Sequence, residues 1–173
     1  MQKPQESLLQ LHRIIDQLTE PLRQRHSARL QCRRGCSNCC VDDLRIFSIE
    51  ADRIVQEHKL LLTNGTAHAR GACAFLSEDG ACRIYASRPY VCRTQGLPLR
   101  WLEVVEHEDV VERRDICSLN IVGEAIENLR EEECWTIGPV ESKLRELEDA
   151  YTHGQPKRVA LRDLFVNRLS NAG

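Results

Sequence analysis

The sequence lacks the features that would place it in a membrane or on a nucleic acid. Its longest unbroken apolar run is the five residues 72–76, whereas a membrane-spanning helix needs about 20. Only 5% of the residues are aromatic, and Lys plus Arg (24) nearly balance Asp plus Glu (26), which leaves a formal net charge of −2. Proteins that bind nucleic acids or membrane surfaces through bulk charge or stacked rings have more of both features. We therefore expect neither a nucleic acid nor a membrane as partner.

The N-terminal segment, MQKPQESLLQLHR, has no apolar core of the kind found in secretory signal peptides, so we expect a cytoplasmic protein. The chain has 173 residues, 42% of them hydrophobic, which suits one ordinary domain. We expect a single domain over 1–173, made of an N-terminal helix at 5–30, a cysteine-cluster metal-binding core at 32–120 and a helical C-terminal part at 121–173.

Apolar residues recur at spacings of three and four in two segments, and each pattern indicates an amphipathic helix. The first stripe consists of Leu8, Leu11, Ile15, Leu18 and Leu22. The second helix is expected to begin at Pro139, a residue favoured in the first turn, and its stripe consists of Val140, Leu144, Leu147 and Tyr151.

Shorter patterns complete the predicted fold. Acidic residues after Ser48 indicate a helix start, and Asn64-Gly65 is a plausible end for that helix. Two β-rich pieces between Trp101 and Arg113 flank Glu108-Asp109 and predict a hairpin, and 158–168 is expected to form a last short helix. These patterns predict a mainly α fold class, with helices packed around an irregular cysteine-rich metal-binding core and a small β-hairpin.

Cysteine is the one unusual count, with nine residues in the chain. In a reducing compartment, clustered thiols are more often metal ligands than disulfides. Four of them form the pattern Cys32-x3-Cys36-x2-Cys39-Cys40, and a two-residue gap lets one turn aim two thiolates at one ion. The side chains of the adjacent Cys39 and Cys40 are expected to diverge, so this pair suits two metals or two positions of one cluster.

Four later cysteines would supply the remaining ligands from loops brought together by folding. They are Cys73, Cys82, Cys92 and Cys117. Eight candidates suit two four-cysteine sites, one polynuclear site, or one site with spare thiols. The interpretation without a metal is that some are small buried hydrophobes, as free cysteines often are.

The segments CRRGCSNCC, ACAFL and ACRIYASRPYVCR, followed by a later lone cysteine, resemble the YkgJ-like, or CxxCxxCC, family of zinc- or iron-chelating cysteine-cluster proteins. The most specific part is the stretch 82–93. The resemblance covers about residues 32–120 and implies metal chelation through Cys36, Cys39, Cys40, Cys73, Cys82 and Cys92, with Cys32 and Cys117 as further matching positions. The ninth cysteine, Cys134, matches no position of the family and is left out of the site. A related module in flagellin lysine N-methylases resembles an iron–sulfur element.

Arginines near the cysteines could offset the negative charge of metal-bound thiolates, directly or through N–H···S hydrogen bonds. The candidates are Arg33, Arg34, Arg83, Arg88 and Arg93. Arg88 and Arg93 are the better motivated because they lie four residues and one residue from Cys92. For Asp42 and Asp43, turn or solvent roles are expected rather than metal ligation.

The sequence predicts a metal-binding protein that chelates zinc or iron through its cysteines, with zinc slightly favoured because four-thiolate sites suit it. The alternative is an iron–sulfur redox protein or enzyme, with a methyltransferase association, that uses the same cysteines. No catalytic constellation is visible, so the sequence leaves open whether the protein is an enzyme and names no catalytic residue. The expected partner is the metal ion, and the sequence identifies no protein partner.

Overall fold

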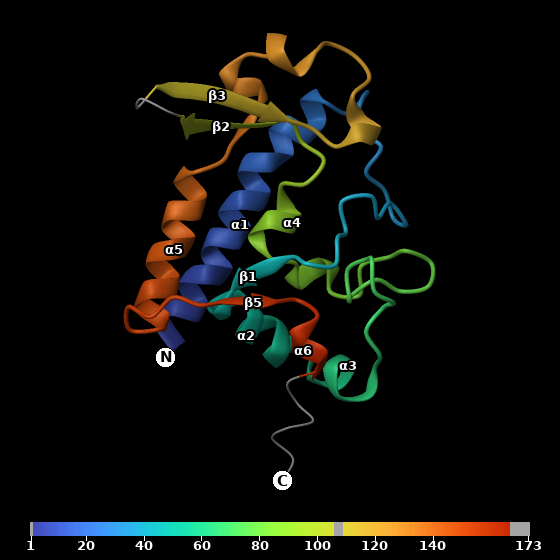
Figure 1. Cartoon of the computed structure of the whole chain (residues 1–173), viewed down its shortest axis with the longest axis vertical. Coiled ribbons are helices and arrows are strands. Elements are labelled where there is room, and N and C mark those ends of the chain that lie inside the picture. Colours follow the sequence, from blue (N-terminus) through green and yellow to red (C-terminus); the bar gives the residue numbers. More distant parts are fainter. Residues whose placement is uncertain (1, 106–108, 167–173) are drawn as a thin grey trace.

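The computed structural model describes residues 2–105 and 109–166 (Figure 1). Its α-helices are α1 (Gln2–Arg25), α2 (Ser48–Glu57), α3 (Lys59–Asn64), α4 (Tyr90–Arg93), α5 (Pro139–Tyr151) and α6 (Asp163–Val166). Its strands are β1 (Arg45–Phe47), β2 (Leu99–Val104), β3 (Val110–Asp115), β4 (Trp135–Thr136) and β5 (Arg158–Ala160). Short 3-10 helices are η1 (Tyr85–Ser87), η3 (Ser118–Asn120), η4 (Ile126–Asn128) and η5 (Glu131–Glu133).

Helices α1 and α5 run antiparallel along one side of the molecule (Figure 1). The predicted stripe of α1 is confirmed at four of its five positions, and Leu18 is the error, with 55% of its surface exposed. The helix continues through Pro21 and ends at Arg25, where a turn replaces the predicted continuation to residue 30. The predicted start of α5 at Pro139 is confirmed.

The structure has two hydrophobic cores. The first, here called the helical core, lies among α1, α4 and α5 and consists of Leu8, Leu11, Ile15, Leu22, Phe47, Ile49, Tyr90, Leu97, Trp135 and Leu144. The second, here called the cysteine-side core, lies between the β1–β5 pair and the cysteine loops and consists of Ile46, Ala51, Ile54, Leu62, Cys73, Phe75, Leu76, Ile84, Leu161 and Leu164. Cys40 and Cys82 pack against the second core.

The prediction of a mainly α fold is wrong, because 44% of the chain is helical and 14% is strand, in two small sheets. The predicted hairpin is confirmed as the antiparallel pair β2–β3, although the predicted turn residue Glu108 lies outside the described residues. Strand β4 joins β2 in parallel, and β1 pairs with β5 with Ile46 opposite Val159. These short pairings join distant segments, so hydrophobic periodicity within one segment does not reveal them.

The predicted last helix at 158–168 is also partly wrong. Its first three residues form β5, only α6 is helical, and 167–168 lie outside the described residues. Ile46 and Leu161 are both almost fully buried in the cysteine-side core, so pairing with β1 places this segment against that core. None of the described helices is long and apolar enough to cross a membrane.

Candidate metal centre

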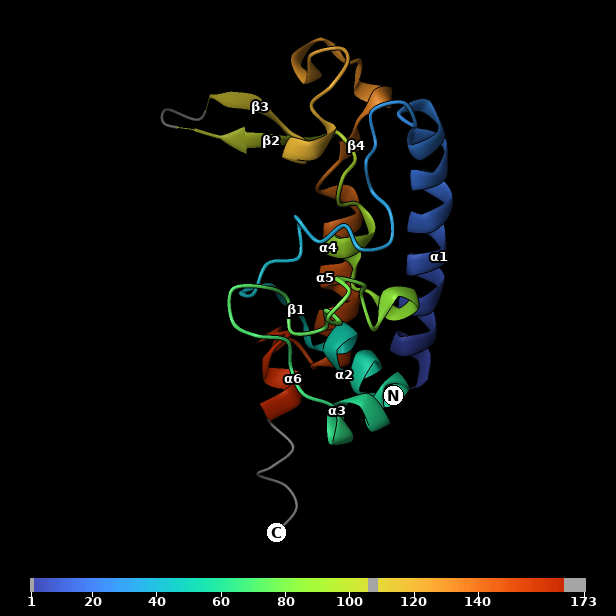
Figure 2. The same cartoon turned by 90° about the vertical axis from the view of Figure 1, so that its right-hand side faces the viewer.

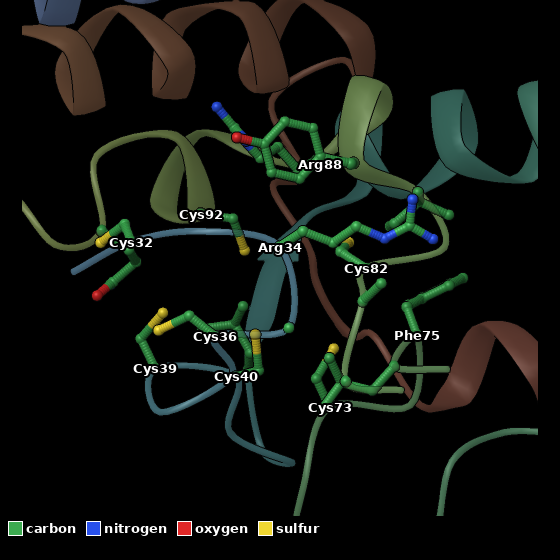
Figure 3. Close-up of a pocket in the computed structure, with 18 of the residues that line it drawn as sticks. Cys32, Arg34, Cys36, Cys39, Cys40, Cys73, Phe75, Cys82, Arg88 and Cys92 are labelled. Atoms are coloured by element: carbon green, nitrogen blue, oxygen red, sulfur yellow. The ribbon is translucent and has the colours of Figure 1, made fainter. Parts of the chain in front are cut away.

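A cavity of about 600 Å³ lies among the cysteine loops. Seven of the nine cysteines line it, namely Cys32, Cys36, Cys39, Cys40, Cys73, Cys82 and Cys92. They come from three segments: the loop 32–40, the loop 73–82 and helix α4. Figure 3 shows six of these side chains arranged around one space, with Cys32 at its edge.

Tight turns in the first loop present its thiols to the cavity. The backbone N–H of Cys36 donates to the carbonyl of Arg33, and that of Cys40 donates to the carbonyl of Ser37, each at 2.9 Å. The two loops are then joined directly, because the Cys73 N–H donates to the Cys40 carbonyl at 2.9 Å. Local turns and one backbone contact therefore bring thiols 33 residues apart in sequence to the same cavity.

The loops 32–40 and 73–82 approach each other closely at Gly80. Gly80 has a φ of +75°, a conformation that side chains disfavour, and a Cβ added there would lie 3.1 Å from the Gly35 carbonyl oxygen. The turn that carries Gly80 is held by the Ser77 N–H, which donates to the Ala81 carbonyl at 2.9 Å, and by a bridge between Leu76 and Cys82. This turn orients Cys82 toward the loop 32–40.

Arg162, near the C-terminal end of the described chain, ties both loops to the cysteine-side core. Its guanidinium donates to the carbonyls of His68 and Ala72 at 2.8 and 2.9 Å and forms an ion pair with Asp42. The Gly71 N–H donates to the other Asp42 oxygen at 2.9 Å, and this bond together with Arg162 lowers the pKa of Asp42. Asp42 therefore fastens the loops, which agrees with a turn role rather than metal ligation.

Polar contacts fix the position of helix α4, which carries Cys92. The carboxylate of Glu50, which is only 3% exposed, accepts from the Tyr90 N–H at 2.7 Å. The guanidinium of Arg93 pairs with Asp16 at 2.6 Å and donates to the Ala86 carbonyl at 3.0 Å. Arg93 therefore anchors α4 to α1 instead of facing the thiols, which corrects the expectation that it offsets thiolate charge.

The other candidate arginines fall into two groups, one that donates to backbone carbonyls and one that lines the cavity. Arg83 donates to the carbonyls of Thr66 and Ala74, so it serves the backbone as Arg93 does. Arg33, Arg34 and Arg88 line the cavity, as does Arg23 of α1, which sequence reasoning missed. Arg23 stands in the predicted helix with no cysteine nearby in sequence, so no local signal points to it.

The thiols influence one another's ionisation. Burial raises the pKa of Cys92, and negative charge on Cys73, Cys82 and Cys39 raises it further. The neighbouring Cys39 and Cys40 thiols interact with each other, contrary to the expected divergence of their side chains, and this interaction lowers the pKa of Cys39 to about 6 and raises that of Cys40. Closely spaced thiols that resist ionising together can all ionise when a cation replaces their protons.

Two predicted ligands, Cys32 and Cys117, and the excluded Cys134 differ in their surroundings from the six principal cysteines. Cys32 lies under Gly96, where an added Cβ would be 2.3 Å from its sulfur, and the Asn120 amide lies 3.5 Å from that sulfur. Cys117 is outside the cavity lining and faces the Asn38 amide at 4.0 Å. Cys134, which the sequence left out of the site, is 6% exposed and also outside the lining.

Within residues 2–105 and 109–166, no three His, Cys, Asp or Glu side chains already stand together as a set that could hold an ion. The cysteines share a cavity, but their side chains are not closed around one point. The donor set nevertheless fits a soft metal, because seven thiols line the cavity and no described carboxylate or imidazole does so.

Thiols gathered from separate segments into one cavity define a cysteine-cluster domain. A family model, CxxCxxCC, described as a "Putative zinc- or iron-chelating domain", matches residues 31–118, which is half of the chain. The chain belongs to this family, which confirms the resemblance to it, and membership supports metal binding. The match does not carry the name YkgJ. No curated protein and no solved structure matches the chain significantly.

Proposed function

We propose that the protein chelates zinc in the cysteine-lined cavity, with Cys36, Cys39, Cys40, Cys73, Cys82 and Cys92 as the principal ligands. Cys32, at the edge of the cavity, is an additional ligand position, and so is Cys117, which lies outside the lining. The observation that carries the proposal is that thiols from three segments line one cavity that lacks carboxylate and imidazole groups among the described residues. Four-thiolate sites bind Zn²⁺ at about 2.3 Å per bond without further chemical machinery.

The number of thiols also favours a centre with more than one metal. Six principal thiols exceed the four that one tetrahedral ion uses, and Cys39 and Cys40 are adjacent in sequence. Two zinc ions that share thiolates satisfy this count, and so does an iron–sulfur cluster. The iron–sulfur centre is the second candidate, and it would give the protein a redox role.

Elemental analysis and an absorption spectrum of protein purified without oxygen test both candidates. We expect a colourless protein with bound zinc, because zinc has no redox chemistry and no visible absorption. A brown protein with iron and sulfide would favour the second candidate. A protein without stoichiometric metal of either kind would contradict the proposal.

Serine variants test the ligand assignment. Cys92→Ser is expected to lose at least half of the bound metal, because it removes the thiol that helix α4 contributes. Cys134→Ser is the control, since this buried cysteine lies outside the cavity lining, and it should retain all of the metal. Circular dichroism of both variants checks that they fold, and full metal content in folded Cys92→Ser would refute the assignment.

A further inference from the structure

The cavity combines its thiols with positive charge. Four arginines line it, Arg23, Arg33, Arg34 and Arg88, and no Asp or Glu does so in the part of the chain that the structure describes. One divalent ion with four thiolates, or two with six, carries a net charge of −2. Arg34 also pairs with Asp79 at 3.6 Å, and Arg23 donates to the Arg93 carbonyl at 2.5 Å. Even with the Asp79 charge counted, the four guanidinium groups outweigh a metal centre with a net charge of −2.

Arg88 is the arginine best placed for a ligand. Its guanidinium stacks on the Tyr85 ring, with the guanidinium carbon 4.0 Å from the ring centroid, and its buried Nε has no hydrogen-bond partner among the described residues. Figure 3 shows Arg88 beside Cys92 at the edge of the cavity. A guanidinium held flat on a ring presents a rigid fork of donors, the geometry that carboxylates and phosphates accept.

The size of the cavity leaves room beyond the metal. Its volume of about 600 Å³ falls within the range of roughly 300–1,000 Å³ that small-molecule sites occupy. Ions bound at thiolate distances fill only a small part of such a space. Phe75, Leu76 and Ile84 form an apolar wall near the thiols, which can cover the carbon atoms of an organic ligand.

We propose that the cavity binds, next to the thiol-held metal, a small molecule that carries a carboxylate or phosphate group, with Arg88 as its principal contact. The bound oxyanion supplies the hydrogen-bond partners that Arg88 lacks, and Tyr85 supports the guanidinium from one side. This inference deepens the proposed function and rests on it for the position of the metal. On this proposal the cavity binds a metal and an anion together rather than a metal alone.

The test measures binding of inorganic phosphate and of succinate to the metal-loaded full chain by isothermal titration calorimetry. We expect at least one of the two anions to bind at millimolar concentration or below. Arg88→Gln should weaken that binding at least about tenfold, because a charge-assisted bidentate contact is lost. Arg88→Lys keeps the charge without the fork and should give an intermediate affinity. Arg113→Gln, on the exposed strand β3, is the control and should bind as the native protein does.

The outcomes separate this inference from the proposed function. Binding of phosphate alone or of succinate alone supports the inference and identifies the anion class. No binding of either anion, or equal affinity in Arg88→Gln, overturns the inference while the metal content of the native protein still supports chelation. Loss of metal from Arg88→Gln also overturns it, because Arg88 would then serve the metal thiolates instead. Native protein that binds an anion but no metal contradicts the proposed function alone.

Discussion

The two cores of the molecule are built from different chemistry. The helical core is filled by aliphatic and aromatic side chains, half of them from α1 and α5, whereas the cysteine-side core includes Cys73, with Cys40 and Cys82 packed against it. Figure 2 shows the cysteine loops on the side of the molecule away from α1. Burial of apolar side chains chiefly stabilises the helical core, whereas the cysteine side contains thiols whose charge changes on metal binding.

The two regions also differ in how their backbone is held. In α1 and α5 the backbone is satisfied by its own helical hydrogen bonds. The cysteine loops combine short backbone turns with side-chain anchors, chiefly Arg162, which donates to carbonyls of the adjoining segment 68–72. We therefore expect the cysteine loops to adjust their conformation around a bound ion more readily than α1 and α5.

The largest loss of stability is expected from a substitution in the helical core. Leu144 of α5 is 2% exposed in the helical core, so Leu144→Ala should lower the free energy of unfolding by about 3 kcal/mol through lost burial and a cavity. Chemical denaturation measures this loss. Metal content per folded molecule should not change, because Leu144 does not line the cavity.

Leu18→Ala is the matched control, since this residue of α1 is mostly exposed. It should change the free energy of unfolding by no more than about 0.5 kcal/mol. A fall in metal content in folded Leu144→Ala would show that the two sides are not independent.

A smaller effect is expected on the cysteine side. Arg162→Ala removes hydrogen bonds from a charged donor and should cost about 2 kcal/mol. Amide hydrogen exchange should quicken at 40–44 and 68–73 while α1 stays protected. Arg145→Ala, which removes only an exposed pair with Asp149, should leave exchange in these loops unchanged. Equal acceleration in α1 and the loops would contradict the distinction between the two sides.

The sequence predicted the helical side better than the cysteine side. The spacing of Leu8, Leu11 and Ile15 specifies one buried helix face, so local periodicity was sufficient there. The prediction is wrong for Leu18, because the apolar stripe of α1 is wider than the part of the helix that neighbouring elements cover. Cysteine spacing indicated a metal centre, yet only the fold shows which segments form the cavity.

Contacts between distant segments had no sequence signal. The Glu148 carboxylate, fully buried on α5, accepts from the Ile49 N–H at 2.9 Å and from the Ser48 hydroxyl at 2.6 Å, which satisfies the start of α2. A glutamate in a helical pattern is usually exposed to solvent, so the sequence gives no sign that Glu148 is buried or that it caps α2. The same holds for Arg162, whose partners lie about 90 to 120 residues away, and for Arg23, which donates to the Arg93 carbonyl at 2.5 Å.

The junction between the two sides contains a buried histidine. The His12 Nε2 lies 3.1 Å from a Glu50 carboxylate oxygen, and Nδ1 lies 2.6 Å from an Arg53 guanidinium nitrogen. Because the guanidinium can only donate, Nδ1 accepts, and the neutral ring carries its proton on Nε2. Glu50 also holds the Tyr90 N–H, so this histidine supports the helix that carries Cys92.

The smallest predicted effect is the pH dependence of this junction. Burial lowers the pKa of His12 from 6.5, although Glu50 partly opposes the shift, so the unfolded chain binds the proton more readily than the folded protein. The free energy of unfolding should therefore fall as the pH drops below about 6.5. Denaturation measured between about pH 7 and about pH 5 should show a shallower fall in His12→Gln, with exposed His153→Gln as control. Superimposable profiles of the native protein and His12→Gln would show that the proton is taken up elsewhere. A change confined to His12→Gln would place the pH-sensitive link at the contact between the helical frame and α4.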